Sequence, residues 1–329
     1  MTIRMPAEWE QHEWLWIGFP WNVAEWGDAD RLAQAQAQIA AFADAVRAGG
    51  KGEDVRLVCN DETSAAQARA LLTSDAQIVV QRIGDVWLRD TGPIGVVGPA
   101  RERVLVDFRF NGWGGKYDMP GDEDIGARLA ATTALPCLSA PFIFEGGAVD
   151  TDGTGLFVTT EQCLLNPNRN PGVDKRQIET LLAGTLGLTD MLWLGDGLLN
   201  DHTDGHVDNL ARFVAPGVIA IPQASTDDDP NATIYADAAA RAKAHGLTVA
   251  PMPSPGRVEV DGEIIPASYM NFLIGNAAVV VPVYGYPNDE AMLSTLAPFF
   301  PGRDIVPLPS DGILAGGGSF HCTSQQMPS

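Results

Sequence analysis

The chain has 329 residues, which is enough for one large domain or two ordinary ones. Hydrophobic residues make up 45% of it, a share typical of a globular protein with a substantial core. The formal net charge of −21 argues against a nucleic-acid-binding function and is compatible with a cationic ligand, although acidity also serves solubility.

The cysteines indicate the compartment. They are widely scattered and form no CxxC pair, which favours a reducing, cytoplasmic environment. They are Cys59, Cys137, Cys163 and Cys322. No secretory signal peptide is expected at the amino terminus, because Glu8, Glu10 and Glu13 occupy positions where such a peptide needs an apolar core.

The uncharged segment 264–288 could be mistaken for a membrane span. Three prolines interrupt it, at Pro266, Pro282 and Pro287. Two buried strands around a turn at Gly275-Asn276 fit this segment better, so no membrane association is expected.

Helices and strands alternate along the chain. A helix is predicted from Asp28, where apolar residues recur at three- and four-residue spacing, with a stop at Gly49-Gly50. Further helices are predicted over 62–72, 174–186, 230–244 and 289–296. Strands are predicted over 55–59, 78–80, 142–144 and 156–158, and in the paired strands that hold 268–272. The pattern predicts an α/β fold.

The segment 85–93 places two carboxylates, Asp85 and Asp90, beside Trp87 and Arg89, just before a Gly-Pro turn. One interpretation is an ion pair between Arg89 and an aspartate that closes a loop. The other is a cation site, in which a carboxylate binds a guanidinium or ammonium and Trp87 offers an aromatic face.

Two glycine-rich segments follow. The loop 111–117 contains Trp113 and resembles a mobile loop that covers a substrate, although a plain surface loop is an equal alternative. Glu145 ends an apolar strand and precedes Gly146-Gly147, and a carboxylate in such a turn is more often in a site than on a solvated face.

The most polar cluster of the chain is 200–208. Its residue types could bind zinc, and His202, His206, Asp208 and Cys322 would suffice as ligands. Against zinc, Gly205 disrupts a helix on which both histidines would share a face, and no glutamate follows the first histidine. We therefore predict no metal.

Cys322 follows the glycine run 316–318. Three glycines let the backbone adopt positive φ and let another group approach closely, so this cysteine is a candidate nucleophile. The alternative is a tight turn followed by a small buried cysteine. Polar turns elsewhere that contain histidine and carboxylates favour the catalytic interpretation.

These polar turns are regularly spaced. Asp90, Glu145, His206, Asn271 and Cys322 are separated by 55, 61, 65 and 51 residues in turn. The spacing is compatible with five similar α/β units, each of which delivers one group to a common centre.

Many segments together resemble the agmatine deiminase family of guanidine-modifying penteins, nearly from end to end. They are MPAEWE at 5–10, WLRDTGP at 87–93, FNGWGGKY at 110–117, EGGAVDTDG at 145–153, TTEQCLLNPNRNP at 159–171, GHVDN at 205–209, SYMNF at 268–272 and GGGSFHCTSQQMP at 316–328. The resemblance implies one catalytic domain over 1–329, a five-bladed pseudosymmetric α/β propeller of ββαβ units around a central pocket. It also implies hydrolysis of agmatine to N-carbamoylputrescine and ammonia without metal or organic cofactor.

Carried over by motif, the resemblance implies Cys322 as nucleophile and His206 as general acid/base. Asp90 and Asp208 would hold the guanidinium nitrogens, with Glu145 beside His206. The further residues expected to bind the substrate are Trp87, Trp113, Asn271 and Gly317.

The chemistry itself calls for these residue types. A guanidinium is a poor electrophile because its charge is delocalised, and two carboxylates can orient it while a thiolate attacks. Because Asp90, Asp208 and Glu145 disfavour a further anion, Cys322 is expected to be a neutral thiol until a bound guanidinium offsets them.

Two segments depart from the family pattern, the opening WIGFPWNVAEW and the loop around His202. Alternatives therefore stay open: a deiminase of another guanidine such as free or C-terminal arginine, a zinc-dependent amidohydrolase, or a non-catalytic guanidine-binding paralogue. The expected partner is a small cationic guanidine, without nucleic acid or membrane, and a homo-oligomer is possible.

Overall fold

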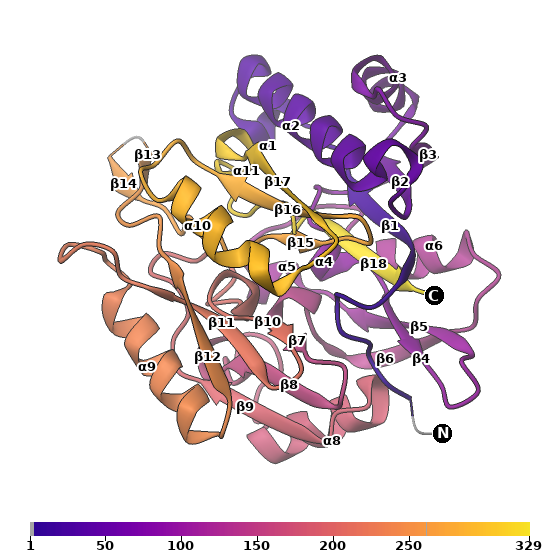
Figure 1. Cartoon of the computed structure of the whole chain (residues 1–329). Coiled ribbons are helices and arrows are strands. Elements are labelled where there is room, and N and C mark those ends of the chain that lie inside the picture. Colours follow the sequence, from indigo (N-terminus) through magenta and orange to yellow (C-terminus); the bar gives the residue numbers. More distant parts are fainter. Residues whose placement is uncertain (1–2, 261) are drawn as a thin grey trace.

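The computed structural model describes residues 3–260 and 262–329. In this part of the chain the strands form one small hairpin and five sheets of three or four strands. Figure 1 shows these sheets arranged around a centre, with the helices α2 (Ala29–Arg47), α6 (Ile125–Ala131), α8 (Lys175–Leu186), α9 (Ala232–Ala244) and α10 (Asp289–Leu296) on the periphery. The expected five-bladed α/β propeller is confirmed.

Each sheet repeats one pattern, an antiparallel pair followed by a peripheral helix and a parallel third strand. The first unit contains β4 (Ile94–Val97), β5 (Arg103–Arg109) and β6 (Cys137–Ile143). The second contains β7 (Asp150–Thr151), β8 (Leu156–Thr160) and β9 (Asp190–Leu194). The third contains β10 (Arg212–Ala215), β11 (Val218–Gln223) and β12 (Thr248–Pro253). The fourth contains β15 (Leu273–Ile274), β16 (Ala278–Val283) and β17 (Asp304–Pro309). The hairpin of β13 (Glu259–Val260) and β14 (Glu263–Ile264) precedes it.

The fifth unit joins the two ends of the chain. Its antiparallel pair consists of β18 (Ser324–Pro328) and β1 (His12–Gly18), paired from Ile17 opposite Ser324 to Trp14 opposite Met327. The register shifts between Trp14 and His12, which lies opposite Pro328. Strands β2 (Asp54–Cys59) and β3 (Gln77–Val80) complete it, with α3 (Glu62–Leu71) between them. This pairing places Cys322, just before β18, beside the amino-terminal segment.

The apolar core lies at the junctions between units. Each peripheral helix packs against the sheet of the preceding unit: α6 against β1 and β2, α8 against β6, α9 against β9, α10 against β12, and α2 against β16. In α10, for example, Met292 and Leu296 pack against Met252 of β12. No unit therefore buries its helix alone, and the ring must close before every helix is covered.

The sequence predicted most element boundaries closely. Helix α2 begins after Asp28, whose side chain accepts hydrogen bonds from the first-turn amides, and α10 spans the predicted 289–296. The uncharged segment 264–288 contains β15 and β16 around the predicted turn. No helix of the described residues is long and apolar enough to cross a membrane.

One prediction was wrong. Residues 268–272 are not in the paired strands but form an irregular segment that precedes β15. Side chains bind the backbone groups that strand partners would otherwise satisfy: Arg212 donates to the carbonyls of Met270 (3.3 Å) and Phe272 (2.8 Å), and the Ser268 hydroxyl accepts from the Met270 amide (3.0 Å).

Candidate active site

The five polar turns occupy equivalent places in the fold. Asp90 lies on α4 (Leu88–Thr91) just before β4, and Glu145 lies just before β7. His206 precedes β10, Asn271 precedes β15, and Cys322 precedes β18. Each turn thus leads into the first strand of its unit, which is why residues spaced 51 to 65 apart come together at one centre.

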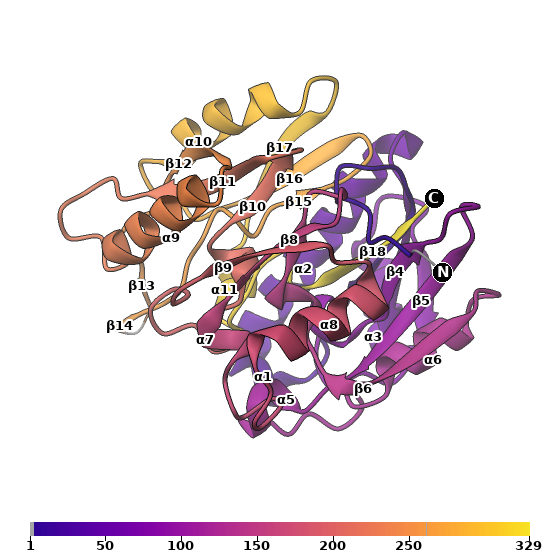
Figure 2. The same ribbon diagram turned by 90° about the horizontal axis from the view of Figure 1, so that it is seen from below.

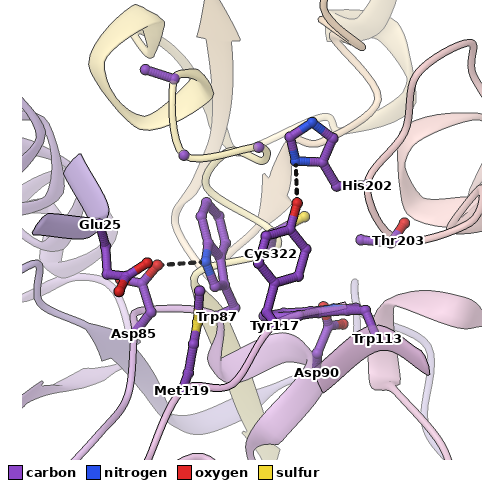
Figure 3. A pocket seen from close by; sticks show the side chains of 13 residues that line it. Glu25, Asp85, Trp87, Asp90, Trp113, Tyr117, Met119, His202, Thr203 and Cys322 are labelled. Atoms are coloured by element: carbon purple, nitrogen blue, oxygen red, sulfur yellow. Dashed lines mark hydrogen bonds between the residues drawn. The ribbon is translucent and has the colours of Figure 1, made fainter. Parts of the chain in front are cut away.

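A cavity of about 190 Å³ opens at this centre (Figure 3). It is lined by Glu25, Asp85, Trp87, Asp90, Trp113, Tyr117, Met119, His202, Thr203, Ala315, Gly316, Gly317 and Cys322. Its walls include the short helices α1 (Val23–Trp26) and α5 (Gly112–Gly115), which Figure 2 shows on the same face of the ring. Of the predicted residues, Glu145, His206, Asp208 and Asn271 are absent from this lining and lie buried behind it.

Cys322 is held at the cavity wall by Asn271. The Asn271 amide nitrogen lies 3.0 Å from the Cys322 sulfur, and its carbonyl oxygen accepts from the Cys322 backbone amide at 3.1 Å. The sulfur also lies 3.4 Å from Asp208 Oδ2. Burial, together with the charges of Asp208 and Asp90, raises the pKa of Cys322 well above its usual value. Burial and these two carboxylates therefore favour the neutral thiol.

The glycine run is sterically required beside this thiol. A Cβ on Gly318 would lie 2.6 Å from the Trp87 ring and 3.1 Å from the Cys322 sulfur, and Gly317 has φ of 107°, which other residues adopt only with strain. Trp87, in turn, stacks on Trp26 with ring centroids 6.4 Å apart.

His206 is fully buried between two carboxylates. Its Nδ1 lies 3.6 Å from Asp90 Oδ1, and its Nε2 lies 3.3 Å from Glu145 Oε2. Glu145 is itself held by the Arg169 guanidinium, with Nε at 2.9 and 3.2 Å from its two oxygens. Burial opposes the charged ring, but Asp90 and Glu145 outweigh it and raise the pKa of His206 well above the usual value. His206 can therefore act as an acid at neutral pH.

Asp90 is fixed by two donors, the indole of Trp113 (2.9 Å) and the backbone amide of Gly147 (3.0 Å). Burial raises its pKa to about 6, with a further contribution from Asp208. A Cβ on Gly147 would lie 2.7 Å from both Asp90 Oδ1 and His206 Nδ1 and 3.2 Å from Asp208 Oδ2. The carboxylates and the imidazole therefore converge on one point, which only a glycine leaves open.

Asp208 differs from Asp90 in the direction in which its pKa is shifted. Its Oδ2 accepts from His321 Nδ1 at 2.7 Å, while its Oδ1 is buried and has no hydrogen-bond partner among the described residues. Burial would raise the pKa of Asp208, but the hydrogen bond and the charge of His321 outweigh it and hold the pKa below the usual value. One oxygen of an ionised carboxylate is thus left unused.

The contacts of Arg89 do not fit the alternative in which it forms an ion pair with an aspartate of 85–93. Arg89 does not pair with Asp85 or Asp90; it donates to Gln325 (3.0 Å) and lies 3.7 Å from Glu8. His202 lies at the cavity wall, where its Nδ1 bonds the Tyr117 hydroxyl at 3.0 Å.

The four candidate zinc ligands are not among the described side chains that lie close enough to share an ion, apart from His206. In the described chain, the histidine, cysteine and acid side chains close enough to share an ion are Glu145, Cys163 and His206. Glu145 in that group is already bound by Arg169, and Cys163 is fully buried.

Sequence reasoning missed several residues of this region. Arg169 lies within the quoted motif TTEQCLLNPNRNP, and Glu25 lies in the opening segment that departs from the family pattern. Glu8 and His321 lie inside two quoted motifs, MPAEWE and GGGSFHCTSQQMP. Their place in these motifs is the one feature of the sequence that could have indicated a role in the site.

The comparisons with known proteins agree with this architecture. A family model described as Porphyromonas-type peptidyl-arginine deiminase matches residues 4–328. The agmatine deiminase of Pseudomonas aeruginosa (strain LESB58) is 36% identical over 99% of this chain and 95% of its own. The solved agmatine deiminase of Enterococcus faecalis superposes with a TM-score of 0.91 at 31% identity, over 100% of this chain and 96% of that one. The substrate-bound agmatine deiminase of C. jejuni superposes with a TM-score of 0.89 at 27% identity, over 99% and 96%.

The first prediction concerns the charge of His206. The pKa of His206 is higher in the folded protein than in the unfolded chain, so protonation of this ring stabilises the fold. The stabilisation is complete below about pH 6.5 and is lost as the pH rises through the raised pKa. Nitrogen-15 NMR of labelled histidine should show His206 still protonated at pH 7.5. Glu145→Gln should lower its midpoint. A wild-type midpoint near 6.5 would contradict this electrostatic account.

Proposed function

The chain belongs to the Porphyromonas-type peptidyl-arginine deiminase family, and from this membership and the site geometry we propose that it hydrolyses agmatine to N-carbamoylputrescine and ammonia. The observation that carries the proposal is the convergence of Asp90, His206 and Asp208 beside Gly147, with the Cys322 sulfur 3.4 Å from Asp208. Two carboxylates, an acid and a thiol are the groups that deimination of a guanidinium needs.

Binding comes first. The guanidinium of the substrate places its nitrogens on Asp90 and on the free Oδ1 of Asp208, in charge-assisted hydrogen bonds. Its positive charge offsets the carboxylates that keep the thiol neutral. The Cys322 proton is then released to solvent, and the thiolate forms beside the carbon it attacks.

The first half-reaction makes a carbon–sulfur bond. The thiolate adds to the central guanidinium carbon, and His206 donates its proton to the leaving nitrogen. The carbon–nitrogen bond breaks and ammonia departs. An amidino group stays bound to Cys322 as a cationic thioether, and the imidazole is left neutral.

The second half-reaction returns the enzyme to its starting state. The neutral His206 takes a proton from water, and the resulting hydroxide adds to the amidino carbon. The intermediate then loses its hydroxyl proton as the carbon–sulfur bond breaks, which releases the ureido product. The sulfur leaves as a thiolate and recovers a proton.

The far end of the cavity carries further negative charge. Glu25 and Asp85 line it beside Trp87, and Asp85 Oδ2 accepts from the Trp87 indole at 2.8 Å. In Figure 3 these two carboxylates lie on one side of Trp87, away from Cys322. The lining contains no arginine or lysine among the described residues. This end suits the ammonium of agmatine, whereas the carboxylate of arginine would lack a cationic partner.

The second prediction tests the nucleophile. Cys322→Ala should abolish ammonia release from agmatine with an unchanged melting temperature, because no other thiol reaches the guanidinium carbon. Mass spectrometry of acid-quenched wild-type enzyme should find the amidino group on Cys322. Cys59→Ala serves as the matched control for a buried thiol. An adduct on Cys59, Cys137 or Cys163 would refute the assignment.

The third prediction tests substrate choice. The kcat/KM for agmatine should exceed that for free arginine by at least about tenfold, roughly 1.4 kcal/mol of discrimination. Glu25→Gln should narrow this ratio by raising KM for agmatine, since the ammonium loses a partner. Parallel assays of ureido product would measure both. Equal kcat/KM for the two substrates in the wild type would favour the alternative, a deiminase of arginine.

A further inference from the structure

A second charged cluster adjoins the site through Asp208, and the mechanism above does not use it. Its centre is Glu8, from the amino-terminal motif, which is 4% exposed. Glu8 Oε2 lies 2.8 Å from both His321 Nε2 and Arg212 Nη2 and 3.7 Å from Arg89, while its Oε1 accepts from the Ile274 amide at 2.7 Å. Desolvation opposes the charge of Glu8, but Arg212 and His321 outweigh it and hold its pKa well below the usual value.

The cluster draws a group from every unit of the ring. Arg89 precedes β4, Arg212 begins β10, Ile274 belongs to β15, and His321 precedes β18. Asp150, at the start of β7, bonds Arg212 Nε at 3.2 Å. One carboxylate from the amino-terminal segment therefore ties together the turns that present the site residues.

His321 connects this cluster to the reacting groups. Its Nδ1 lies 2.7 Å from Asp208 Oδ2 and its Nε2 lies 2.8 Å from Glu8 Oε2. An ionised carboxylate only accepts hydrogen bonds, so both contacts are made only when both ring nitrogens carry protons. The bond from Nδ1 occupies Asp208 Oδ2, and the partnerless Oδ1 stays available.

We propose that Glu8 and His321 are positioning residues for deimination, which hold Asp208 ionised and turned so that its free Oδ1 receives the guanidinium. The inference rests on the function proposed above. Without the His321 bond, burial would raise the pKa of Asp208, and a protonated Asp208 would bind the cation weakly. The titratable and charged groups that face Asp208 and His321 are Glu8, Asp90, Asp150, His206, Arg89, Arg212 and Cys322.

Two substitutions of His321 separate positioning from packing. The side-chain nitrogen of asparagine lies near the place of Nδ1 and can still donate to Asp208, whereas that of glutamine lies near the place of Nε2 and can reach only Glu8. The probe is 2-chloroacetamidine, a cation that loses chloride as the Cys322 sulfur is alkylated. Neutral iodoacetamide reports the reactivity of the same sulfur without the cation contacts. Rates are measured by mass spectrometry from pH 5.5 to 9.

With 2-chloroacetamidine, His321→Asn should keep its rate within about tenfold of wild type, while His321→Gln and Glu8→Gln should lose at least about thirtyfold. In the latter two the acid limb of the rate profile should move to higher pH, because the pKa of Asp208 rises. Iodoacetamide rates should not fall, because loss of the Asp208 charge lowers the pKa of Cys322. Glu10→Gln, in the same motif but paired with Arg4 at the surface, is the matched control and should match wild type.

Three results would overturn the proposal and leave only a packing role. They are an equal loss of alkylation rate in His321→Asn and His321→Gln, an acid limb that does not move, and an equal loss of rate with both probes. If Glu8→Gln fails to fold, the two His321 variants decide. Ammonia release from agmatine by the wild type, measured in parallel, tests the proposed function separately. An enzyme that is alkylated by 2-chloroacetamidine but releases no ammonia would contradict the proposed function, and the variant rates would still decide the roles of Glu8 and His321.

Discussion

Repulsion among buried carboxylates is the constraint on which the site depends. Asp90 and Asp208 act on the Cys322 thiol, and Glu145 lies behind them against His206. Burial makes each negative charge costly unless a cation lies nearby. Arg169 forms an ion pair with Glu145, and His321 pairs with Asp208. Asp90 has His206, a single titrating cation, and its pKa stays raised to about 6. The missing positive charge is the one that a guanidinium substrate brings.

The ring architecture explains how these charges are brought together. Equivalent turns of the five units carry different residues, so one fold element supplies an acid, a thiol and carboxylates in turn. Because each peripheral helix packs against the preceding sheet as well as its own, the site geometry depends on ring closure. The pairing of β18 with β1 completes that closure next to Cys322, so the proposed nucleophile lies at the junction of the two chain ends.

The sequence pattern predicted the structural features that neighbouring residues determine. The cap at Asp28, the helix 289–296 and the turn at Gly275 all follow from neighbouring residues, and the spacing of the polar turns indicated the five units. The strand predicted at 268–272 failed because Arg212, remote in sequence, binds its carbonyls. The contact of Glu8 with His321 spans most of the chain and exists only once the ring closes, so no local signal could indicate it.

The central claim is that Cys322 stays a neutral thiol until a guanidinium arrives, and the ultraviolet absorbance of its thiolate tests this most directly. The Cys322→Ala difference titration should give a midpoint above about pH 8.5 for the empty enzyme, because burial, Asp208 and Asp90 disfavour the anion. A guanidinium analogue that is bound but not hydrolysed should move the midpoint down. A Cys322 midpoint below about pH 7 in the empty enzyme would contradict the account and indicate a standing thiolate–imidazolium pair.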